Sequence, residues 1–263
     1  MEPLGFVNTG NDCYFNSVIQ LLVNIPEYIT YLNIRKENNL HLSTLEKIIY
    51  IVNKKRNYDK SIKIFDMLHH IDPKEYDGTQ KDACEFMLRL LENYVDNNPK
   101  SLSEQIYCRT CLKCGNQINS KNVQFPIYVE KYNMDKFVIP QPGFFIDHSN
   151  CEIEMKCDKC SHSIHSEKHG YKVDDILFLC IKRFNYDLTK DNSPIENLLE
   201  FSQGKILLGV VCHYGTTTSG HYFTINFINE KWYLLNDEKV EEITTENVIR
   251  YAENFGYLFV FSV

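Results

Sequence analysis

The chain has 263 residues with 28 basic and 35 acidic side chains, which give a net charge of −7 at pH 7. A hydrophobic fraction of 43% and a charged fraction of 24% are typical of folded globular domains and exclude a largely disordered chain. The acidic balance disfavours nucleic-acid binding, which needs a basic face, and no window approaches the roughly 18 to 20 apolar residues of a membrane-spanning helix.

The first 95 residues show mainly helical periodicity. Apolar residues spaced three and four apart predict a helix over residues 13–25, which Pro26 ends. The same spacing recurs in residues 28–71. A further helix is predicted to open at Gly78 and to run through residues 79–94.

After residue 106 the pattern becomes that of β-strands. Short apolar or alternating runs are separated by clusters of glycine, asparagine and aspartate, as antiparallel strands joined by turns require. The predicted strands are residues 123–129, 176–184, 206–211, 221–228, 231–235 and 257–263. This order predicts an α+β fold, in which a sheet follows a helical lobe and a cysteine-rich insert occupies residues 106–165.

Ten cysteines are the first functional signal. The opening residues lack the cationic stretch and apolar run of a secretory signal, so we expect a reducing compartment, where clustered cysteines indicate metal binding or catalysis. Cys13 stands at the first turn of a predicted helix, where the helix dipole and free N–H groups favour a thiolate. On position alone, a small buried packing residue remains the alternative.

A cysteine nucleophile needs a histidine base, and that base needs an orienting acceptor. His221 begins one predicted strand and Asn236 follows the next, so a hairpin would bring them together. We expect the Asn236 oxygen to accept the Nδ1 proton of His221, which would direct Nε2 at the sulfur. With nine histidines in the chain, a chance pairing is the alternative. Four other histidines are interpreted as surface or core residues: His148, His165, His169 and His213.

Five segments resemble motifs of the ubiquitin-specific proteases, a branch of the papain-like cysteine proteases. GFVNTGNDCYFNS is similar to their cysteine box, GLxNxGNTCYxNS, and SGHYFTINFINEKWYLLNDEKV to their histidine box. QKDACEFM resembles QQDAxEFL, DILFLCIKRF resembles a strand ending in LKRF, and GYLFVF resembles the closing strand. The five segments follow the family's order over residues 5–261, so together they are a far more specific signal than any one of them.

The resemblance implies a role for each matching residue. Cys13 becomes the nucleophile, His221 the general base, and Asn236 the third member of the triad, with Asp237 as an alternative or auxiliary orienter. Asn8 matches an asparagine whose amide helps to bind the oxyanion, and the backbone N–H groups of residues 12 and 13 could complete that site.

Two positions depart from the family pattern. Asp12 stands where threonine is usual, and its carboxylate would oppose thiolate formation if it pointed inward, or cap the helix if it did not. Asn236 replaces the more common aspartate, so the imidazolium is expected to have no fully charged partner.

The implied substrate is ubiquitin, whose tail Leu-Arg-Leu-Arg-Gly-Gly would reach Cys13 through a narrow channel. Asp82 matches a position that binds the tail, with Gln80 nearby, and Tyr222 is expected to line the channel beside the glycines. The alternatives are helix caps for Gln80 and Asp82, and simple strand packing for Tyr222.

Two CxxC pairs predict a structural zinc site with closed thiolate coordination. They are Cys111 with Cys114 and Cys157 with Cys160. Cys108 offers an alternative first pair, but the family's Cys-Gly step favours Cys111 and Cys114. Reduced cysteines without metal are the alternative.

We therefore predict one catalytic domain over residues 1–263, with a mainly helical thumb at 1–105, zinc-bearing fingers at 106–175 and a palm sheet at 176–263. We expect a deubiquitinating thiol protease that acts on ubiquitin and ubiquitinated proteins. It should hold one structural Zn²⁺ and no organic cofactor, and be a monomer of the cytoplasm or nucleus, or of the host cytoplasm if the chain is viral. The alternatives are a protease for a ubiquitin-like modifier and a non-catalytic ubiquitin-binding scaffold. A zinc-knuckle nucleic-acid binder is disfavoured by the charge balance.

Overall fold

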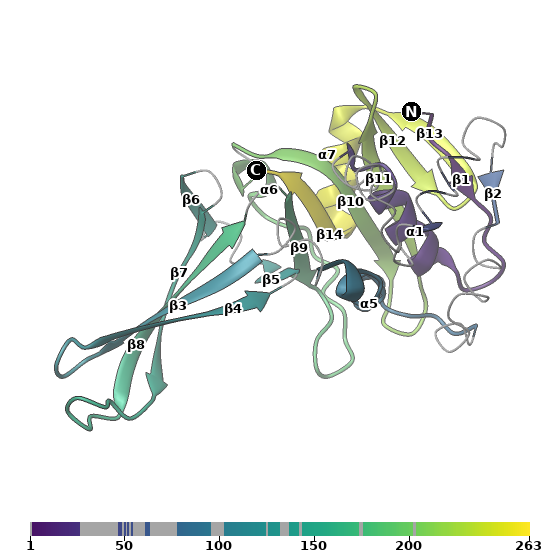
Figure 1. The fold of residues 1–263 in the computed structure, drawn as a ribbon. Helices are drawn as coiled ribbons and strands as arrows, with labels where there is room; N and C mark the ends of the chain where they lie inside the picture. Colours follow the sequence, from purple (N-terminus) through teal and green to yellow (C-terminus); the bar gives the residue numbers. More distant parts are fainter. Residues whose placement is uncertain are drawn as a thin grey trace.

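The computed structural model describes residues 2–26, 47–48, 50, 52, 54, 61–63, 78–95, 103–124, 126–131, 137–141, 144–173, 176–201 and 204–263. The helices predicted in residues 28–71 lie almost entirely outside this set. The described residues form helices packed on two sheets (Figure 1). Among these residues, no helix has the length and apolar content needed to cross a membrane.

The helices are α1 (Cys13–Leu22), α5 (Ala83–Val95), α6 (Leu198–Phe201) and α7 (Thr245–Phe255). The palm sheet has the order β13-β12-β11-β10-β14-β9-β5 and consists of β5 (Ile127–Glu130), β9 (Ile176–Lys182), β10 (Ile206–Gly215), β11 (Gly220–Ile228), β12 (Lys231–Asn236), β13 (Lys239–Ile243) and β14 (Gly256–Ser262). The finger sheet has the order β4-β3-β8-β7-β6 and consists of β3 (Ser103–Cys111), β4 (Gln117–Gln124), β6 (Phe137–Gln141), β7 (Phe144–Glu154) and β8 (Ile164–Val173). The short strands β1 (Gly5–Phe6) and β2 (Ser61–Ile62) pair in parallel.

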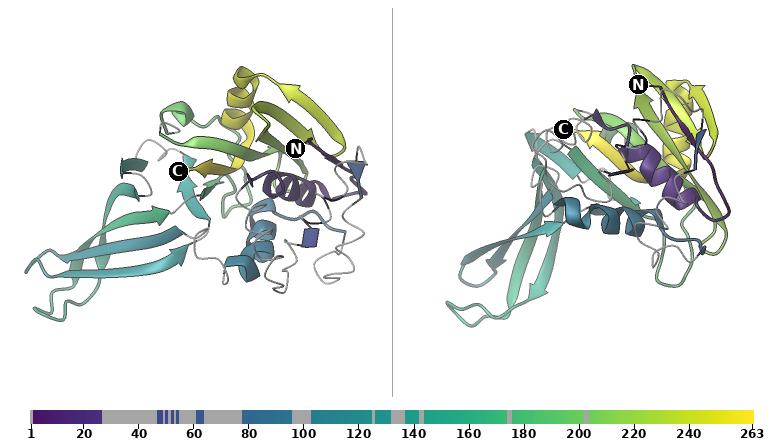
Figure 2. Two further views of the ribbon diagram at one scale, coloured as in Figure 1. Left: turned by 45° about the horizontal axis from the view of Figure 1, so that its top comes forward. Right: turned by 45° about the vertical axis from the view of Figure 1, so that its right-hand side comes forward.

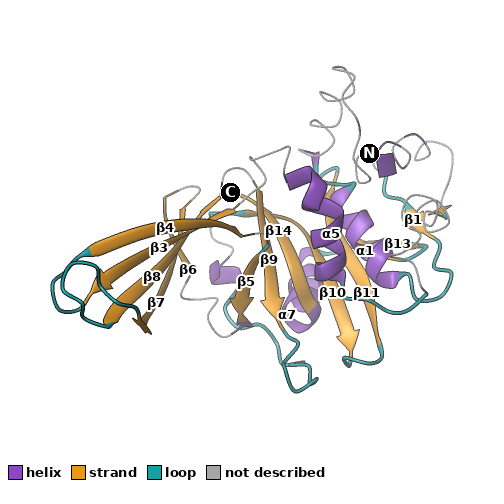
Figure 3. Cartoon of the chain, turned by 60° about the horizontal axis from the view of Figure 1, so that its bottom comes forward, coloured by secondary structure: helices purple, strands orange, loops and turns teal. Residues whose placement is uncertain are grey.

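The centre of the palm sheet is covered on both faces, which explains why β9 is a continuous apolar run. Phe178 and Cys180 of this strand pack in a core cluster that contains residues of α1 and α5. Leu177 and Leu179 point the other way, into a second cluster that contains residues of α7. Figure 3 shows α1 and α5 on one side of the sheet and α7 on the other.

Helix α1 is fixed to β11 by polar groups as well as by apolar packing. The hydroxyl of Thr224 donates to the carbonyl of Ser17 at 2.7 Å, and the amide of Asn226 donates to the carbonyl of Leu21 at 3.1 Å. Both strand side chains are buried. Because buried donors are costly to leave unpaired, these bonds fix where the helix lies along the strand, and so where Cys13 lies.

The finger sheet extends away from the palm sheet and the helices, as both views in Figure 2 show. The CxxC turns lie at the β3–β4 and β7–β8 connections, and the register of β3 with β8 places Cys111 opposite His165. The insert that was predicted only as cysteine-rich is therefore a set of long antiparallel strands.

The structure corrects several predicted boundaries. The strand predicted over residues 123–129 is two strands, because Pro126, which lacks a backbone N–H, lies between β4 and β5. The helix expected to open at Gly78 begins at Ala83 instead, because the carboxylate of Asp82 accepts the N–H groups of residues 84 and 85 and caps it. Helix α7 and strand β13 were not predicted.

Candidate active site and metal centre

Cys13 is the first residue of α1, as predicted, and its side chain is 5% exposed. Its backbone N–H has no partner within the helix, since the first four N–H groups of any helix lack one. The preceding Asp12 does not cap α1 with its side chain. Its carboxylate instead accepts the N–H of Thr9 at 2.8 Å and the hydroxyl of Thr9 at 2.5 Å. These bonds hold the carboxylate of Asp12 on the loop before the helix, so the helix cap, one of the two alternatives for this residue, is not formed.

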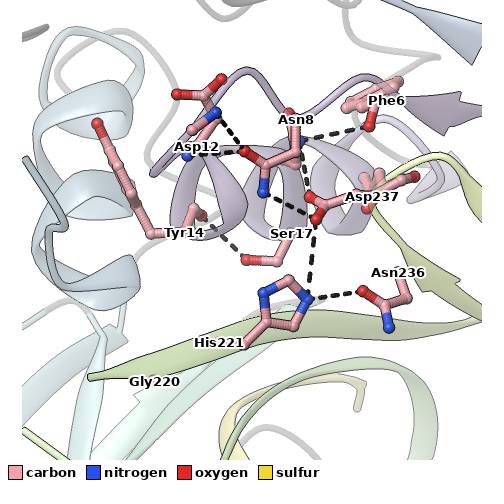
Figure 4. A network of polar contacts seen from close by, with 12 residues as sticks. Phe6, Asn8, Asp12, Tyr14, Ser17, Gly220, His221, Asn236 and Asp237 are labelled. Atoms are coloured by element: carbon pink, nitrogen blue, oxygen red, sulfur yellow. Dashed lines mark hydrogen bonds and ion pairs between the residues drawn. The ribbon is translucent and has the colours of Figure 1, made fainter. Parts of the chain in front are cut away.

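The hairpin of β11 and β12 brings His221 to Asn236, as predicted, but through the other ring nitrogen. Nε2 of His221 lies 2.7 Å from Oδ1 of Asn236 (Figure 4). Because Thr224 pairs with Leu235, Asn236 lies diagonally across from His221 rather than opposite it. At this diagonal separation the contact is made by Nε2, the ring nitrogen farther from the backbone. Nδ1 is therefore the nitrogen left for Cys13, and the predicted assignment of the two nitrogens was wrong.

Asp237, predicted as an alternative or auxiliary orienter, brings a full negative charge to the histidine. The expectation from Asn236 alone, that the imidazolium would have no charged partner, is therefore corrected. Its Oδ2 lies 3.8 Å from Nε2 of His221. The amide of Asn8 donates to the same oxygen at 2.9 Å (Figure 4). The amide of Asn16 donates to Oδ1 at 2.8 Å. The carboxylate is thus fixed between the N-terminal segment and the histidine.

The main chain of Asp237 is held by the same segment. Its carbonyl accepts the N–H of Phe6 at 2.8 Å and the amide of Gln20 at 3.0 Å. Asp237 has a positive φ of 51°, in the tight turn between β12 and β13. The carbonyl of the next residue, Glu238, would lie 2.3 Å from a Cβ at Gly5, so only glycine fits there.

The surroundings of His221 favour the imidazolium. Hydrogen bonding with the Cys13 side chain raises its pKa most, and burial lowers it. The bond to Asn236 and the charges of Cys13 and Asp237 raise it further, so that the pKa is about 9. At neutral pH the ring is therefore mostly protonated.

Asn8 organises the loop before the nucleophile with both ends of its amide. Its Oδ1 accepts the N–H of Gly10 at 2.9 Å and that of Asp12 at 3.3 Å, while Nδ2 donates to Asp237. The N–H of residue 12, which was expected to face the oxyanion, is therefore turned to Asn8. The second hydrogen of Nδ2 and the N–H of Cys13 remain as candidate donors.

A pocket of about 550 Å³ opens beside Cys13. All three predicted substrate-binding residues line it: Gln80, Asp82 and Tyr222. Oδ2 of Asp82 accepts the hydroxyl of Tyr257 at 2.7 Å and that of Tyr222 at 3.4 Å, and Oδ1 caps α5. Asp82 is thus both a helix cap and the acceptor that orients two tyrosines of the pocket wall.

Sequence reasoning missed three residues of this site. Asn16, which is 1% exposed, binds Asp237, and its position one helical turn after Cys13 was the available signal. His213, interpreted as surface or core, is buried and lines the pocket next to Gly220. Burial, together with nearby positive charge, lowers its pKa to about 3, so this ring is neutral. No local pattern marked Tyr257.

The four predicted metal ligands come together at the end of the finger sheet. The sulfur atoms of Cys111, Cys114, Cys157 and Cys160 lie within 4.8 Å of one another. Cys111 and Cys160 are 3.6 Å apart, and Cys114 and Cys157 are 3.7 Å apart. A Zn–S distance of ~2.3 Å in a tetrahedron gives S···S edges of about 3.8 Å, so the donor set fits zinc.

The backbone around Cys111 also favours a thiolate. Burial opposes its ionisation, but N–H groups of Cys114 and Lys113 donate to the sulfur, and its pKa is about 6. Cys108, the alternative ligand, is outside the cluster. Four further cysteines lie outside the cluster: Cys84, Cys180 and Cys212 are buried, whereas Cys151 is exposed.

A histidine held between a helix-terminal cysteine and an amide oxygen is typical of cysteine hydrolases. The model of one family, ubiquitin carboxyl-terminal hydrolase, matches residues 4–261, and the chain therefore belongs to that family.

Curated relatives and solved structures agree with this assignment. Ubiquitin carboxyl-terminal hydrolase 8 of Saccharomyces cerevisiae is 22% identical over 325 residues, which cover 94% of this chain and 68% of the relative. Ubiquitin carboxyl-terminal hydrolase 11 of Schizosaccharomyces pombe is 21% identical over 292 residues, which cover 95% of this chain and 82% of the relative. The structure of a SAGA DUB module with Ubp8, Sgf11, Sus1 and Sgf73 bound to monoubiquitin has a TM-score of 0.76 at 20% identity, covering 98% of this chain and 68% of that one. The predicted α+β protease fold is confirmed.

Proposed function

We propose that this protein hydrolyses the peptide or isopeptide bond after the C-terminal Gly-Gly of ubiquitin, through an acyl-enzyme on Cys13. The observation that carries the proposal is the arrangement of His221, which interacts with Cys13 while its Nε2 is held by Asn236 at 2.7 Å. The pocket beside the thiol provides room for a peptide tail. Membership of the family supplies the substrate class.

The reaction follows from the protonation states of the site. The Cys13 thiolate attacks the carbonyl carbon of the terminal glycine, and the carbonyl oxygen becomes an oxyanion. His221, which holds the thiol proton as imidazolium, gives it to the departing amine as the C–N bond breaks. A water molecule then attacks the thioester, with His221 as base, and releases the ubiquitin carboxylate and the thiolate.

We assign the oxyanion to Asn8 and to the N–H of Cys13. One hydrogen of the Asn8 amide is engaged by Asp237, which fixes the direction of the other. A preorganised donor of this kind contributes about 2.7–4 kcal/mol in other hydrolases. Asp237 would therefore serve the oxyanion and the histidine together.

The substrate tail would lie in the pocket beside Cys13. Gln80, whose amide donates to the carbonyl of Gly220 at 3.4 Å, and Tyr222 line its walls. Both oxygens of Asp82 already have donors, so we propose that it acts mainly by orienting Tyr222 and Tyr257. Glu85 also lines the pocket, and its side chain is 69% exposed, with the carboxylate 3.8 Å from Arg89. We propose that an arginine of the tail is a second partner of this carboxylate.

We also propose that the four-cysteine cluster holds one Zn²⁺. Closed thiolate coordination leaves no position for substrate, so the ion would cross-link the ends of the finger strands. The expected result is one zinc per chain by elemental analysis, with loss of zinc and of thermal stability in Cys114→Ser. A protein purified without zinc at full stability would contradict this.

The activity is tested with ubiquitin that carries a thiol-reactive C-terminal group, with the adduct read by intact mass. The wild type should form one adduct and Cys13→Ala none. Cys84→Ala is the matched control, because Cys84 lines the same pocket and should be dispensable. An adduct that survives Cys13→Ala would refute the nucleophile. An adduct only with a ubiquitin-like modifier would overturn the substrate, and no adduct from a folded protein would leave a non-catalytic scaffold.

A further inference from the structure

His165 lies in the finger sheet and is fully buried, with an exposed fraction of 0%. Neither of its ring nitrogens has a hydrogen-bond partner among the described residues. An imidazole always offers at least one N–H donor, and a buried donor without a partner is strongly unfavourable. Such a buried group calls for a hydrogen-bond partner in its immediate surroundings.

The strand register places this histidine beside the metal centre. His165 of β8 is directly opposite Cys111 of β3, so the two side chains lie on the same face of the sheet. The N–H of Cys111 donates to the carbonyl of Asn116, and its carbonyl accepts the N–H of Gly115, both on the side away from β8. Cys111 and His165 therefore form a non-hydrogen-bonded pair, the type in which facing side chains are closest.

The other neighbours on this face leave the ring without a polar partner. Across β7, His165 is opposite Ile153, which is apolar. Two residues along β8, the carboxylate of Glu167 binds Arg109 at 2.5 Å and lies 4.0 Å from the sulfur of Cys151. Of the facing groups, the sulfur of Cys111 is the acceptor that, as a metal-bound thiolate, can take a ring N–H in addition to the N–H groups of Lys113 and Cys114.

We propose that His165 donates a ring N–H to the Cys111 thiolate of the zinc-bound centre. This inference rests on the proposed zinc site and adds to it a residue that hydrogen-bonds a ligand without binding the metal itself. Four thiolates on Zn²⁺ carry a net charge of −2, and an N–H donor to one of them lowers the basicity of that sulfur and slows its protonation and loss. The same bond gives the buried imidazole the partner that it lacks.

The test measures zinc retention, which does not depend on catalysis. Wild-type protein, His165→Leu and His165→Gln are loaded with one zinc, and transfer of zinc to a chromogenic chelator is followed at pH 7. His162→Leu is the matched control, because His162 lies on the same Cys-rich turn but is only partly buried. We expect His165→Leu to bind zinc about 10- to 100-fold more weakly. His165→Gln, which keeps an N–H donor, should lose less, and His162→Leu should match the wild type.

Cobalt substitution separates an outer donor from a direct ligand. If His165 is an outer donor, Co²⁺-loaded His165→Leu keeps the absorption spectrum of a four-thiolate site. If the spectrum of His165→Leu indicated a different number of thiolate ligands from that of the wild type, His165 would itself be a ligand. Equal zinc retention in His165→Leu and wild type would refute any role of His165 at the metal. Absence of zinc from the wild type would instead refute the zinc site, whatever the variants do.

Discussion

Gly5→Ala tests whether the turn at Asp237 positions the catalytic histidine from a distance. A Cβ at this position would lie 2.3 Å from the Glu238 carbonyl oxygen, and ordinary contact begins at 3.4 Å. The Glu238 carbonyl, and the turn that carries it, must therefore move away from residue 5 by about 1.1 Å. Asn236 and Asp237 lie at the start of this turn, so their contacts with His221, at 2.7 and 3.8 Å, would be disturbed.

The expected effect is large although residue 5 does not line the pocket. A displacement of about 1 Å in a positioning group can reduce activity by about 100-fold, which corresponds to about 2.7 kcal/mol of transition-state stabilisation. The overpacked core would also lose about 1–3 kcal/mol of stability. The assay is kcat/KM for a fluorogenic amide at the ubiquitin C-terminus, together with urea unfolding of the same samples.

Gly10→Ala is the matched control, because a Cβ at Gly10 would meet no atom within 4 Å. It should have the wild-type kcat/KM. If Gly5 acts through the turn, the substitution should cost less than about threefold in a protein that already carries Asn236→Ala and Asp237→Ala. Full activity of Gly5→Ala, or the same loss in that triple variant, would refute the reasoning.

Three further predictions concern charge and packing around the site. Asp237 contributes to a His221 pKa of about 9, so the imidazolium, and with it the activity, should be lost above pH 9. Asp237→Asn should move this alkaline limit of the pH–rate profile to lower pH, and an unchanged limit would contradict the electrostatic role. Arg183→Lys should lower the free energy of unfolding by about 3 kcal/mol or more, because the buried guanidinium donates to four backbone carbonyls that one ammonium cannot all reach. A variant that unfolds in urea at the wild-type midpoint would disprove this. Gly220→Ala should reduce kcat/KM at least about tenfold, because its Cβ would lie 2.1 Å from Nε2 of His213. Adding His213→Ala should restore part of kcat/KM, and an equal loss in the double variant would exclude this clash as the cause.

The parts of the fold that could be predicted are those in which burial leaves a local pattern. Strand β9 is a continuous apolar run because its two faces enter different cores, and the helix at Cys13 carries apolar residues at helical spacing and is buried along its whole length. The pairing of His221 with Asn236 followed from hairpin geometry alone. The CxxC spacing likewise located the metal ligands, because a four-thiolate site needs only two turns of the chain.

The missed elements have sequences in which this pattern is weak. The finger strands are rich in polar residues, and β4, with the sequence QINSKNVQ, has only two apolar residues, so its sequence shows no apolar alternation with a period of two. Helix α7 is polar over most of its surface and buries chiefly Val248 and Ala252. Its cap, Thr244, which accepts the N–H of Asn247, was a usable signal that the prediction did not take up.

The nitrogen of His221 that faces Asn236 could not be predicted for a different reason. Hairpin spacing shows that the two residues are near each other, but not whether they are opposite or diagonal. That depends on where the pairing of β11 and β12 begins, which the structure shows as Thr224 with Leu235. Asp237 was predicted only as an alternative or auxiliary orienter, because its place beside the ring depends on a turn with positive φ and on contacts with the distant N-terminal segment.

Those distant contacts explain why the cysteine box contains amides as well as the nucleophile. Asn16 is 221 residues from Asp237 in sequence, and its buried amide nitrogen binds the Asp237 carboxylate while its own Oδ1 has no partner among the described residues. The cost of leaving the Asn16 oxygen unpaired is offset by the hydrogen bond from its nitrogen to the charged carboxylate of Asp237. Asn8 supplies the second donor to the same carboxylate. The segment that carries the thiolate therefore also fixes the carboxylate beside the histidine, so the two halves of the proposed catalytic site are aligned by one turn.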